Sequence, residues 1–533
     1  MHHMKIFKFT SLFFNSVLLY FTFFFIKLPT WIFDVFGKVS LDQILFFTTN
    51  KTEGTFPIII ESFIFDVLLY CLFTTIFITF SIVLCLIISK NLKTFNRKKT
   101  ILILVFLFVF FLAFVINYKI NIITVLPIIK ISIISVLFTM LVSILFFKDK
   151  YIYKKVLIYS FVSLILAFCN FCFIYDGFEY IYREIFPKYS NFYEQYYINP
   201  KTVNITIPKD KQNLLLICLE SMDWSIIDYV SQYYNLDFSN ISMSNLSFAN
   251  YISGTCQYPT KQALVSMTTG IPFNDSTNLL EKFLKRKKEN IDLDNNYSIY
   301  QILKDAGYSL FFLQGSSTIF ANTETFLKAH GFQDSQICGL EKIRTDYKQI
   351  AEQWYGFDDK DIYEILKNKI IFFEKEQVPF FITMFTIQSH AGPNNKIKEN
   401  SFLIKMSSDL LVDFLNWFKK QNCYKNTTIV IVGDHHRMGD NFDLKTEYDK
   451  KIYNVFINPL ITPYNTNRYF NQVDLFPTIL ESIGFKIQGS KLGIGTSVFS
   501  KEQTLLEKLG KEQLEQFIKQ RNKLYEGFFK YNS

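Results

Sequence analysis

The first third of the chain is a series of long apolar stretches separated by short polar connections. These stretches lie at 9–27, 64–89, 100–118, 131–147 and 156–176. Each is near the ~20 residues that a helix needs to cross a bilayer. No small-residue cleavage site follows the first stretch, so we expect it to remain part of the protein. The pattern predicts a transmembrane domain of five helices in residues 1–178.

Basic residues in the connections predict the orientation of these helices. The connections at 90–99 and 148–155 are densely basic, and Lys5 and Lys8 precede the first stretch. Short basic connections stay on the cytoplasmic side of a membrane. Five spans would then place everything after Asp176 outside the cytoplasm.

The segment that follows the apolar stretches mixes aromatic and charged residues. Tyr180, Tyr182, Arg183 and Tyr193 lie close together in it. Amphipathic rings favour the level of the lipid headgroups. We therefore interpret residues 179–210 as an interfacial helix and linker.

From residue 211 to residue 533 the pattern becomes that of a globular domain. Short apolar runs alternate with helical periodicity, which favours a mostly parallel sheet with helices on both faces, an α/β domain. The expected strands are 213–219, 308–313, 379–386 and 427–432.

Composition and charge agree with a membrane protein. Hydrophobic residues make up 50% and aromatic residues 18% of the chain, and the excess lies in the N-terminal stretches. The net charge of +9 is explained by the basic connections, so we expect no nucleic-acid partner. Four cysteines outside the apolar stretches lack Cys-x-x-Cys spacing, which indicates neither a zinc cluster nor a disulfide framework: Cys218, Cys256, Cys338 and Cys423.

Potential metal ligands and acid–base groups follow three of the expected strands. Glu220 ends the first strand, His390 follows the third, and Asp434 and His435 end the fourth. Ligands in α/β sheets bind beyond the carboxyl ends of the strands. Carboxylate and imidazole together suit Zn²⁺ or Mn²⁺. The alternatives are that Glu220 caps a helix and that Asp434 and His435 are ordinary loop residues.

A hydroxyl residue with catalytic potential begins another helical pattern. Thr260 follows a proline in the segment 258–270. A helix N-terminus favours phosphate or an oxyanion, and a metal could activate the hydroxyl, although Pro-Thr is commonly only a cap. Two other histidines are interpreted as structural: His330, a helix C-cap before a glycine, and His436, which points away from the ligand set.

Taken in order, these motifs resemble the alkaline phosphatase/sulfatase superfamily. The resemblance rests on Leu219-Glu-Ser221, on Thr260 in its segment, on Ser389-His-Ala-Gly-Pro393 and on Gly433-Asp-His435, and it continues through 472–480 and 492–500. Within this superfamily the chain is similar to the membrane-anchored branch of lipoteichoic acid synthases, periplasmic glucan phosphoglycerol transferases and phosphoethanolamine transferases.

The resemblance implies roles for particular residues. Thr260 would be the nucleophile, and Glu220, Asp434 and His435 would join it in holding one or two divalent metal ions, Zn²⁺ or Mn²⁺. His390 would contact the transferred phosphate. The implied reaction moves a phospho-headgroup from a membrane phospholipid to an envelope glycan or lipooligosaccharide.

The resemblance also implies a location. The chain would be a multi-pass protein of the bacterial cytoplasmic (inner) membrane, with its catalytic domain in the periplasm or outside the cell.

Two departures from the family pattern bear on the headgroup. The stretch 314–323 lacks the histidine, tryptophan and arginine with which lipoteichoic acid synthases bind glycerol phosphate, so we favour phosphoethanolamine narrowly over phosphoglycerol. The chain also lacks the cysteines of the lipid A phosphoethanolamine transferases, which favours a glycan or lipooligosaccharide core as acceptor.

Three other functions are compatible with parts of the chain. A membrane-anchored phosphodiesterase or phosphatase, or a sulfatase-type hydrolase, would use water in place of the acceptor. Thr260 stands where sulfatases carry a cysteine or serine in a Cys/Ser-x-Pro-x-Arg motif, so we do not expect sulfate ester hydrolysis. A non-catalytic sensor is disfavoured because all four residues of the metal set are present, and a transporter would not explain the globular domain.

Overall fold

The computed structural model describes most of the chain. It covers residues 2–36, 62–90, 152–175, 177–254, 260–273, 296–350, 352–353, 356–390, 397–437 and 451–528. Most of the described residues up to Ile181 form one compact unit, and those from Tyr182 onward form another.

The first unit contains long apolar helices. They are α1 (His2–Phe36), α4 (Tyr70–Lys90), which continues a π-helical segment at Phe63–Leu69, and α7 (Ile152–Ile174). Among the described residues, three segments are long and apolar enough to cross a membrane: Thr10–Ile32, Phe63–Val83 and Ile152–Ile174. They correspond to the first, second and fifth predicted spans. The predicted spans 100–118 and 131–147 lie outside the described residues.

Polar contacts join these helices to one another. Ser16 of α1 lies 3.1 Å from Thr79 of α4 through their hydroxyl oxygens, and the Trp31 indole N–H donates to Ser62. The Tyr175 hydroxyl, just after α7, donates to the carbonyl oxygen of Pro29. Because lipid offers no hydrogen-bond partners, pairing polar groups between helices favours their association. The short amphipathic helix α8 (Gly177–Ile185) follows.

The described part of the second unit is built on a six-stranded sheet in the order β10-β9-β2-β8-β4-β5. The strands are β2 (Asn213–Leu219), β4 (Ser309–Gln314), β5 (Ile337–Cys338), β8 (Phe380–Phe385), β9 (Thr427–Gly433) and β10 (Asn454–Ile457). All neighbours run parallel except β10, which is antiparallel to β9. The four predicted strands are confirmed, each within one residue at either end.

Side chains of the central strands alternate between two cores because successive residues of a strand point to opposite faces. Leu214 and Leu216 of β2 belong to one core, and Leu215 and Ile217 belong to the other. Both faces are therefore buried, which explains why β2 is apolar along its whole length.

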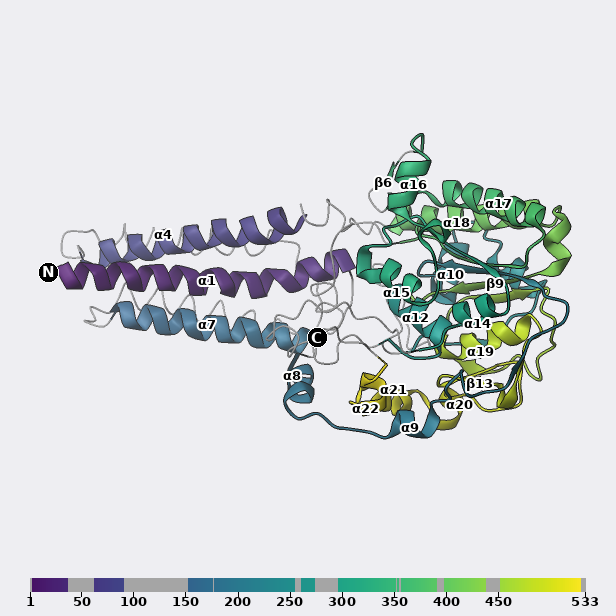
Figure 1. Ribbon diagram of the computed structural model, residues 1–533. Helices are drawn as coiled ribbons and strands as arrows, with labels where there is room; N and C mark the ends of the chain where they lie inside the picture. The colour runs from purple at the N-terminus through teal and green to yellow at the C-terminus, as the bar shows by residue number, and fades with distance from the viewer. Residues whose placement is uncertain are drawn as a thin grey trace. The chain divides into compact units, whose positions relative to one another are not determined.

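Helices cover both faces of this sheet, as Figure 1 shows. One core includes residues of α9 (Phe192–Tyr196), α12 (Thr260–Thr269), α14 (Ile299–Asp305), α15 (Thr323–Ala329), α19 (Gln472–Ser482), α20 (Leu505–Leu509), α21 (Lys511–Lys519) and α22 (Lys523–Glu526). The other includes residues of α10 (Trp224–Ser231), α11 (Phe238–Met243), α16 (Leu340–Asp346), α17 (Asp359–Glu376) and α18 (Ile397–Phe418). The predicted α/β architecture is confirmed.

Candidate functional site

The parallel order β9-β2-β8 brings three sequence-predicted positions to one edge of the sheet. Glu220 follows β2, Asp434 and His435 follow β9, and the segment from Thr386 to His390 follows β8. Because these strands are adjacent and parallel, their carboxyl ends meet.

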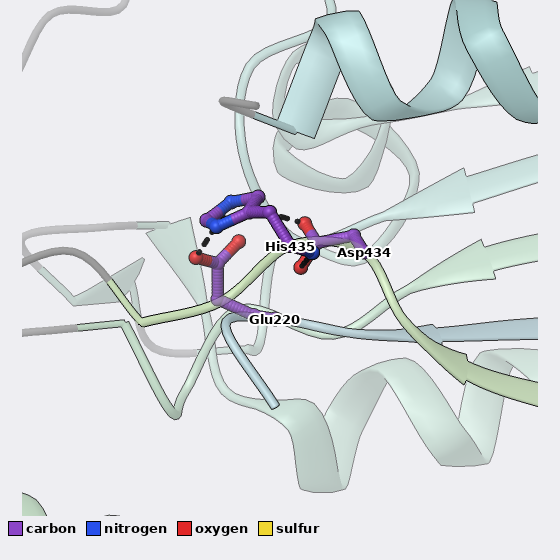
Figure 2. A group of neighbouring side chains, drawn as sticks. All are labelled: Glu220, Asp434 and His435. Atoms are coloured by element: carbon purple, nitrogen blue, oxygen red, sulfur yellow. Dashed lines mark hydrogen bonds and ion pairs between the residues drawn. The ribbon is translucent and has the colours of Figure 1, made fainter. Parts of the chain in front are cut away.

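Glu220, Asp434 and His435 form a buried cluster at this edge (Figure 2). One ligand atom from each residue lies within 4.8 Å of the other two, and the side chains are at most 3% exposed. His435 Nε2 lies 3.6 Å from Glu220 Oε1 and 3.4 Å from Asp434 Oδ2. The three residues are thus gathered around one point.

The other ring nitrogen of His435 has a backbone partner. Nδ1 lies 2.9 Å from the carbonyl oxygen of His436. A carbonyl can only accept, so neutral His435 carries its proton on Nδ1 and keeps the Nε2 lone pair for the cluster. This is the usual way in which a metal-binding histidine is oriented.

The donor set of the cluster fits a divalent metal ion. Asp434 Oδ1 accepts the N–H groups of Ser221 and His435, both at 2.8 Å. Asp434 Oδ2 is buried, and no hydrogen bond to it comes from any described residue. A buried carboxylate oxygen facing an imidazole nitrogen and a second carboxylate suits Zn²⁺ or Mn²⁺.

The electrostatics of the three clustered side chains favour the binding of a positive ion. Burial raises the pKa of Asp434 to about 7, and the nearby Glu220 charge adds to this rise. Burial also opposes ionisation of Glu220 and His435. The histidine charges nevertheless lower the pKa of Glu220, and the two carboxylates raise the pKa of His435. A cation would neutralise both carboxylates and displace the proton that charged His435 carries on Nε2.

Thr260 joins the cluster through Glu220. Its hydroxyl donates to Glu220 Oε2 across 3.1 Å, from the first residue of α12. Thr260 is half-buried, whereas the other nine residues of α12 are buried. The predicted helix at 260 is confirmed, and the hydroxyl lies between the cluster and the helix N-terminus.

His390 lies in the segment after β8. It is half-buried, and its charge lowers the pKa of Glu220, although less than the charge of His435 does.

The segment that contains His390 is held by Asp359 at the start of α17. The Asp359 carboxylate accepts the N–H groups of Ile387 and Gln388 at 2.8 and 3.2 Å. Burial raises the pKa of Asp359 to about 7. Asp359 was not identified from the sequence, where it reads as an ordinary first-turn acid.

Two further residues near the cluster also escaped sequence reasoning. Gln472, at the start of α19, donates from Nε2 to the carbonyl oxygen of Asp434 at 3.0 Å. Arg437 donates from Nη1 to the carbonyl oxygen of Ser389 at 2.7 Å, and its N–H donates to Asp223 at 2.8 Å. Gln472 and Asp434 are 38 positions apart in the sequence, and Arg437 and Ser389 are 48 positions apart. Local periodicity carries no signal for such contacts.

Other residues have the structural places expected of them. His330 is the C-cap of α15, is fully buried and pairs through Nδ1 with Gln301 at 3.1 Å. The His436 side chain is half-buried, and its backbone carbonyl supports His435. Cys218, Cys338 and Cys423 are free thiols, and Cys256 lies outside the described residues.

Comparison with known proteins gives this fold and site a family. The sequence profile of the family named Sulfatase matches residues 212–485, just over half of the chain. The match spans β2 to the end of α19 and contains every candidate site residue.

One curated relative is phosphoglycerol transferase I of Salmonella choleraesuis. It is 25% identical over 262 residues, which cover 44% of this chain but only 32% of that protein. The alignment therefore covers about a third of the relative.

Solved structures with some likeness include two bacterial proteins. An alkaline phosphatase superfamily protein from Vibrio parahaemolyticus has 21% identity and a TM-score of 0.46, covering 58% of this chain and 76% of that chain. The C-terminal periplasmic domain of phosphoethanolamine transferase EptC from Campylobacter jejuni has 14% identity and a TM-score of 0.35, covering 56% and 94%.

The length of the profile match decides the family, and the sequence similarity indicates the branch. The chain belongs to the sulfatase family, within the alkaline phosphatase superfamily, and is a distant relative of phosphoglycerol transferase I that carries N-terminal candidate membrane helices.

Proposed function

We propose that this protein is a metal-dependent transferase anchored in the bacterial cytoplasmic membrane. It moves a phospho-headgroup, phosphoethanolamine or phosphoglycerol, from a membrane phospholipid to an envelope glycan or lipooligosaccharide. The observation that carries the proposal is the 3.1 Å hydrogen bond from the Thr260 hydroxyl to Glu220, which ties a candidate nucleophile to the candidate metal cluster.

Glu220, Asp434 and His435 would hold the metal with Thr260, as one or two ions of Zn²⁺ or Mn²⁺. Such a cation lowers the pKa of a neighbouring hydroxyl and screens the charge of a phosphate. Glu220 Oε2 accepts the hydrogen bond of Thr260, which holds the hydroxyl beside the residues that would bind the metal.

In the first step, Thr260 Oγ1 forms a bond to phosphorus, and the bond from phosphorus to the diacylglycerol oxygen breaks. Diacylglycerol leaves with a proton, and the headgroup phosphate stays on Thr260. His390, the half-buried imidazole beside Glu220, would contact this phosphate. The N-terminal N–H groups of α12 favour its negative charge.

In the second step, an acceptor hydroxyl attacks the same phosphorus from the side that diacylglycerol left. A bond forms between the acceptor oxygen and phosphorus, the bond between Thr260 Oγ1 and phosphorus breaks, and the proton lost by the acceptor hydroxyl passes to the threonine oxygen. Two in-line steps through a covalent intermediate predict ping-pong kinetics. With water as the acceptor, the same steps would give a phosphodiesterase.

The identity of the transferred headgroup depends on two observations that point in different directions. The absence of the histidine, tryptophan and arginine from 314–323 supports phosphoethanolamine. The named activity of the Salmonella relative supports phosphoglycerol. In this structure Gln314 directs its amide N–H groups to the carbonyl oxygens of Ser316 and Ser317, at 3.3 and 2.9 Å, and so holds the turn after β4.

The domain organisation that serves this function is also a proposal. Residues 1–178 would be the membrane domain of five helices, residues 179–210 an interfacial helix and linker, and residues 211–533 the catalytic domain outside the cytoplasm. A lipid donor accounts for attaching the catalytic domain to the membrane.

Product analysis tests the proposal. The purified, metal-loaded protein is incubated in detergent with phosphatidylethanolamine and phosphatidylglycerol, each labelled in its headgroup, with and without an oligosaccharide acceptor. Transfer predicts diacylglycerol together with labelled acceptor. Diacylglycerol with only free phosphoethanolamine or glycerol phosphate in both reactions would instead establish a phosphodiesterase.

A further inference from the structure

Ser221 has a backbone conformation that is unusual for its residue type. It directly follows Glu220 and has a φ of +52°, in the left-handed region. This conformation is energetically unfavourable for a residue other than glycine, and residues that adopt it concentrate at functional sites. Ser221 is also 4% exposed, so the strained residue is buried at the candidate metal cluster.

In this conformation the two hydrogen-bond donors of Ser221, its N–H and its hydroxyl, contact two different carboxylates. The Ser221 N–H donates to Asp434 Oδ1 at 2.8 Å, and its hydroxyl donates to Glu220 Oε1 at 2.6 Å. These carboxylates belong to residues 214 apart in the chain that follow the adjacent parallel strands β2 and β9.

These contacts determine which oxygens remain for a metal. Asp434 Oδ1 receives two N–H groups, which leaves Oδ2 beside His435 Nε2. Glu220 Oε1 receives the Ser221 hydroxyl, and Oε2 receives Thr260. Ser221 thus helps to fix the orientation of both carboxylates, together with the His435 N–H on Asp434 and the Thr260 hydroxyl on Glu220.

The backbone of Glu220 is held by a separate set of contacts. Its N–H donates to the Thr386 hydroxyl at 2.9 Å, and its carbonyl oxygen accepts from the Ser389 hydroxyl at 2.6 Å. Loss of the Ser221 hydroxyl would therefore leave the Glu220 backbone in place and remove one of the two hydrogen bonds to its carboxylate, the one to Oε1.

We propose that Ser221 is a positioning residue that orients Glu220 and Asp434 toward the metal, and that its left-handed backbone conformation allows it to contact both. The inference rests on the proposed function, since it requires a metal at the cluster. Outer partners of metal ligands typically contribute roughly 10–100-fold to metal affinity.

Two substitutions distinguish the effect of the Ser221 hydroxyl from the effect of its backbone conformation. Ser221→Gly removes the hydroxyl but relieves the left-handed strain, and Ser221→Ala removes the hydroxyl while keeping the strain. Gln377→Gly is the matched control, because Gln377 has a φ of +53°, is exposed and ends α17 away from the cluster. When metal is absent, Gln377→Gly should melt at or above the wild-type temperature, and Ser221→Gly should melt above Ser221→Ala, because both lose the hydroxyl and only glycine relieves the strain.

The experiment is a titration of Zn²⁺ and of Mn²⁺ into the full-length, detergent-solubilised protein after chelation, followed by melting temperature and by calorimetry. We expect Ser221→Gly and Ser221→Ala to bind roughly 10–100-fold more weakly than wild type, and Gln377→Gly to bind as wild type does. Wild-type affinity in Ser221→Gly would overturn the positioning role alone. A wild-type protein that binds neither metal would overturn the proposed metal site, and the inference with it.

Discussion

The Thr260 hydroxyl donates to Glu220 across 3.1 Å, although the two residues are 40 positions apart and belong to different elements. Glu220 directly follows a buried strand, and Thr260 begins a helix that packs on the same sheet. One carboxylate therefore faces both the candidate nucleophile and the candidate metal ligands. The proposed chemistry depends on this contact.

Thr260→Ala should abolish transfer with little loss of stability. The threonine is half-buried at a helix end, so its loss removes few contacts, whereas no other group at that position can carry the phosphate. Removal of a nucleophile typically lowers kcat by more than about a thousandfold. Diacylglycerol release and melting temperature are the measurements. Thr260→Ser, which keeps a hydroxyl, should retain part of the activity, and an active Thr260→Ala enzyme would end the proposed mechanism.

Asp434→Asn should remove the stabilisation that metal provides. A neutral amide in place of the buried carboxylate takes one charge from the ligand set, so affinity should fall by more than the roughly 100-fold associated with an outer partner. Chelation should lower the melting temperature of wild type reversibly and leave the variant unchanged. Asp346→Asn, an exposed acid at the end of α16, is the control. Equal metal-induced shifts in wild type and Asp434→Asn would contradict this assignment.

His390→Gln should lower transfer without weakening the metal. The imidazole is assigned to the phosphate, and loss of a group that transfers or shares a proton commonly costs about 10²–10⁴ in rate. The measurements are diacylglycerol release and the metal titration described for Ser221. The same substitution at His330, which lies on α15, should leave the rate near wild type at pH 7.5. A large loss of metal affinity in His390→Gln would instead make His390 a ligand.

Arg468→Met should destabilise the second unit. Arg468 is 7% exposed and forms a two-pronged ion pair with Glu507, with Nε and Nη2 at 2.7 and 2.8 Å from the carboxylate oxygens. Removing one member of such a pair leaves the other uncompensated, and we expect a cost of about 3 kcal/mol. Denaturant unfolding measures it. Lys491→Met breaks the exposed pair with Glu502 and should change stability little, and a similarly small effect at Arg468 would show that burial of its pair does not matter.

His330 should make the protein less stable in mild acid. Burial, aided by the charge of Lys261, lowers the pKa of His330 from 6.5 to about 3. Between those values the unfolded chain binds a proton that the folded chain refuses. The stability tied to this residue is therefore complete above pH 6.5 and declines as pH falls toward 3.

His330→Gln isolates this contribution because glutamine does not titrate. Between pH 7 and pH 5 the wild type should lose about 2 kcal/mol more stability than the variant. The measurement is melting temperature or denaturant unfolding at both pH values. Identical losses in the two proteins would mean that His330 is protonated in the folded state.

Sequence reasoning located the sheet and the three clustered residues because both have local signatures. β2 and β9 are short apolar runs, and each is followed directly by a residue able to bind a metal. The rule that ligands bind beyond the carboxyl ends of parallel strands then predicts that Glu220 and Asp434 meet.

The supporting residues had no such signature. The role of Ser221 comes from a left-handed backbone that periodicity does not encode, although Ser221 stands next to a predicted ligand. Asp359 and Gln472 act through the backbone of Gln388 and Asp434, contacts that depend on how α17 and α19 pack. Such long-range contacts follow from the packed fold and were not predictable from one sequence.

The most direct measurement is mass spectrometry of the peptide that contains Thr260. The metal-loaded protein is incubated with mixed phosphatidylethanolamine and phosphatidylglycerol and no acceptor. The account predicts an adduct on Thr260, whose mass identifies phosphoethanolamine or phosphoglycerol as the transferred group. An unmodified Thr260 while diacylglycerol accumulates would contradict a stable covalent intermediate and favour hydrolysis, and the absence of both adduct and diacylglycerol would contradict the lipid donor.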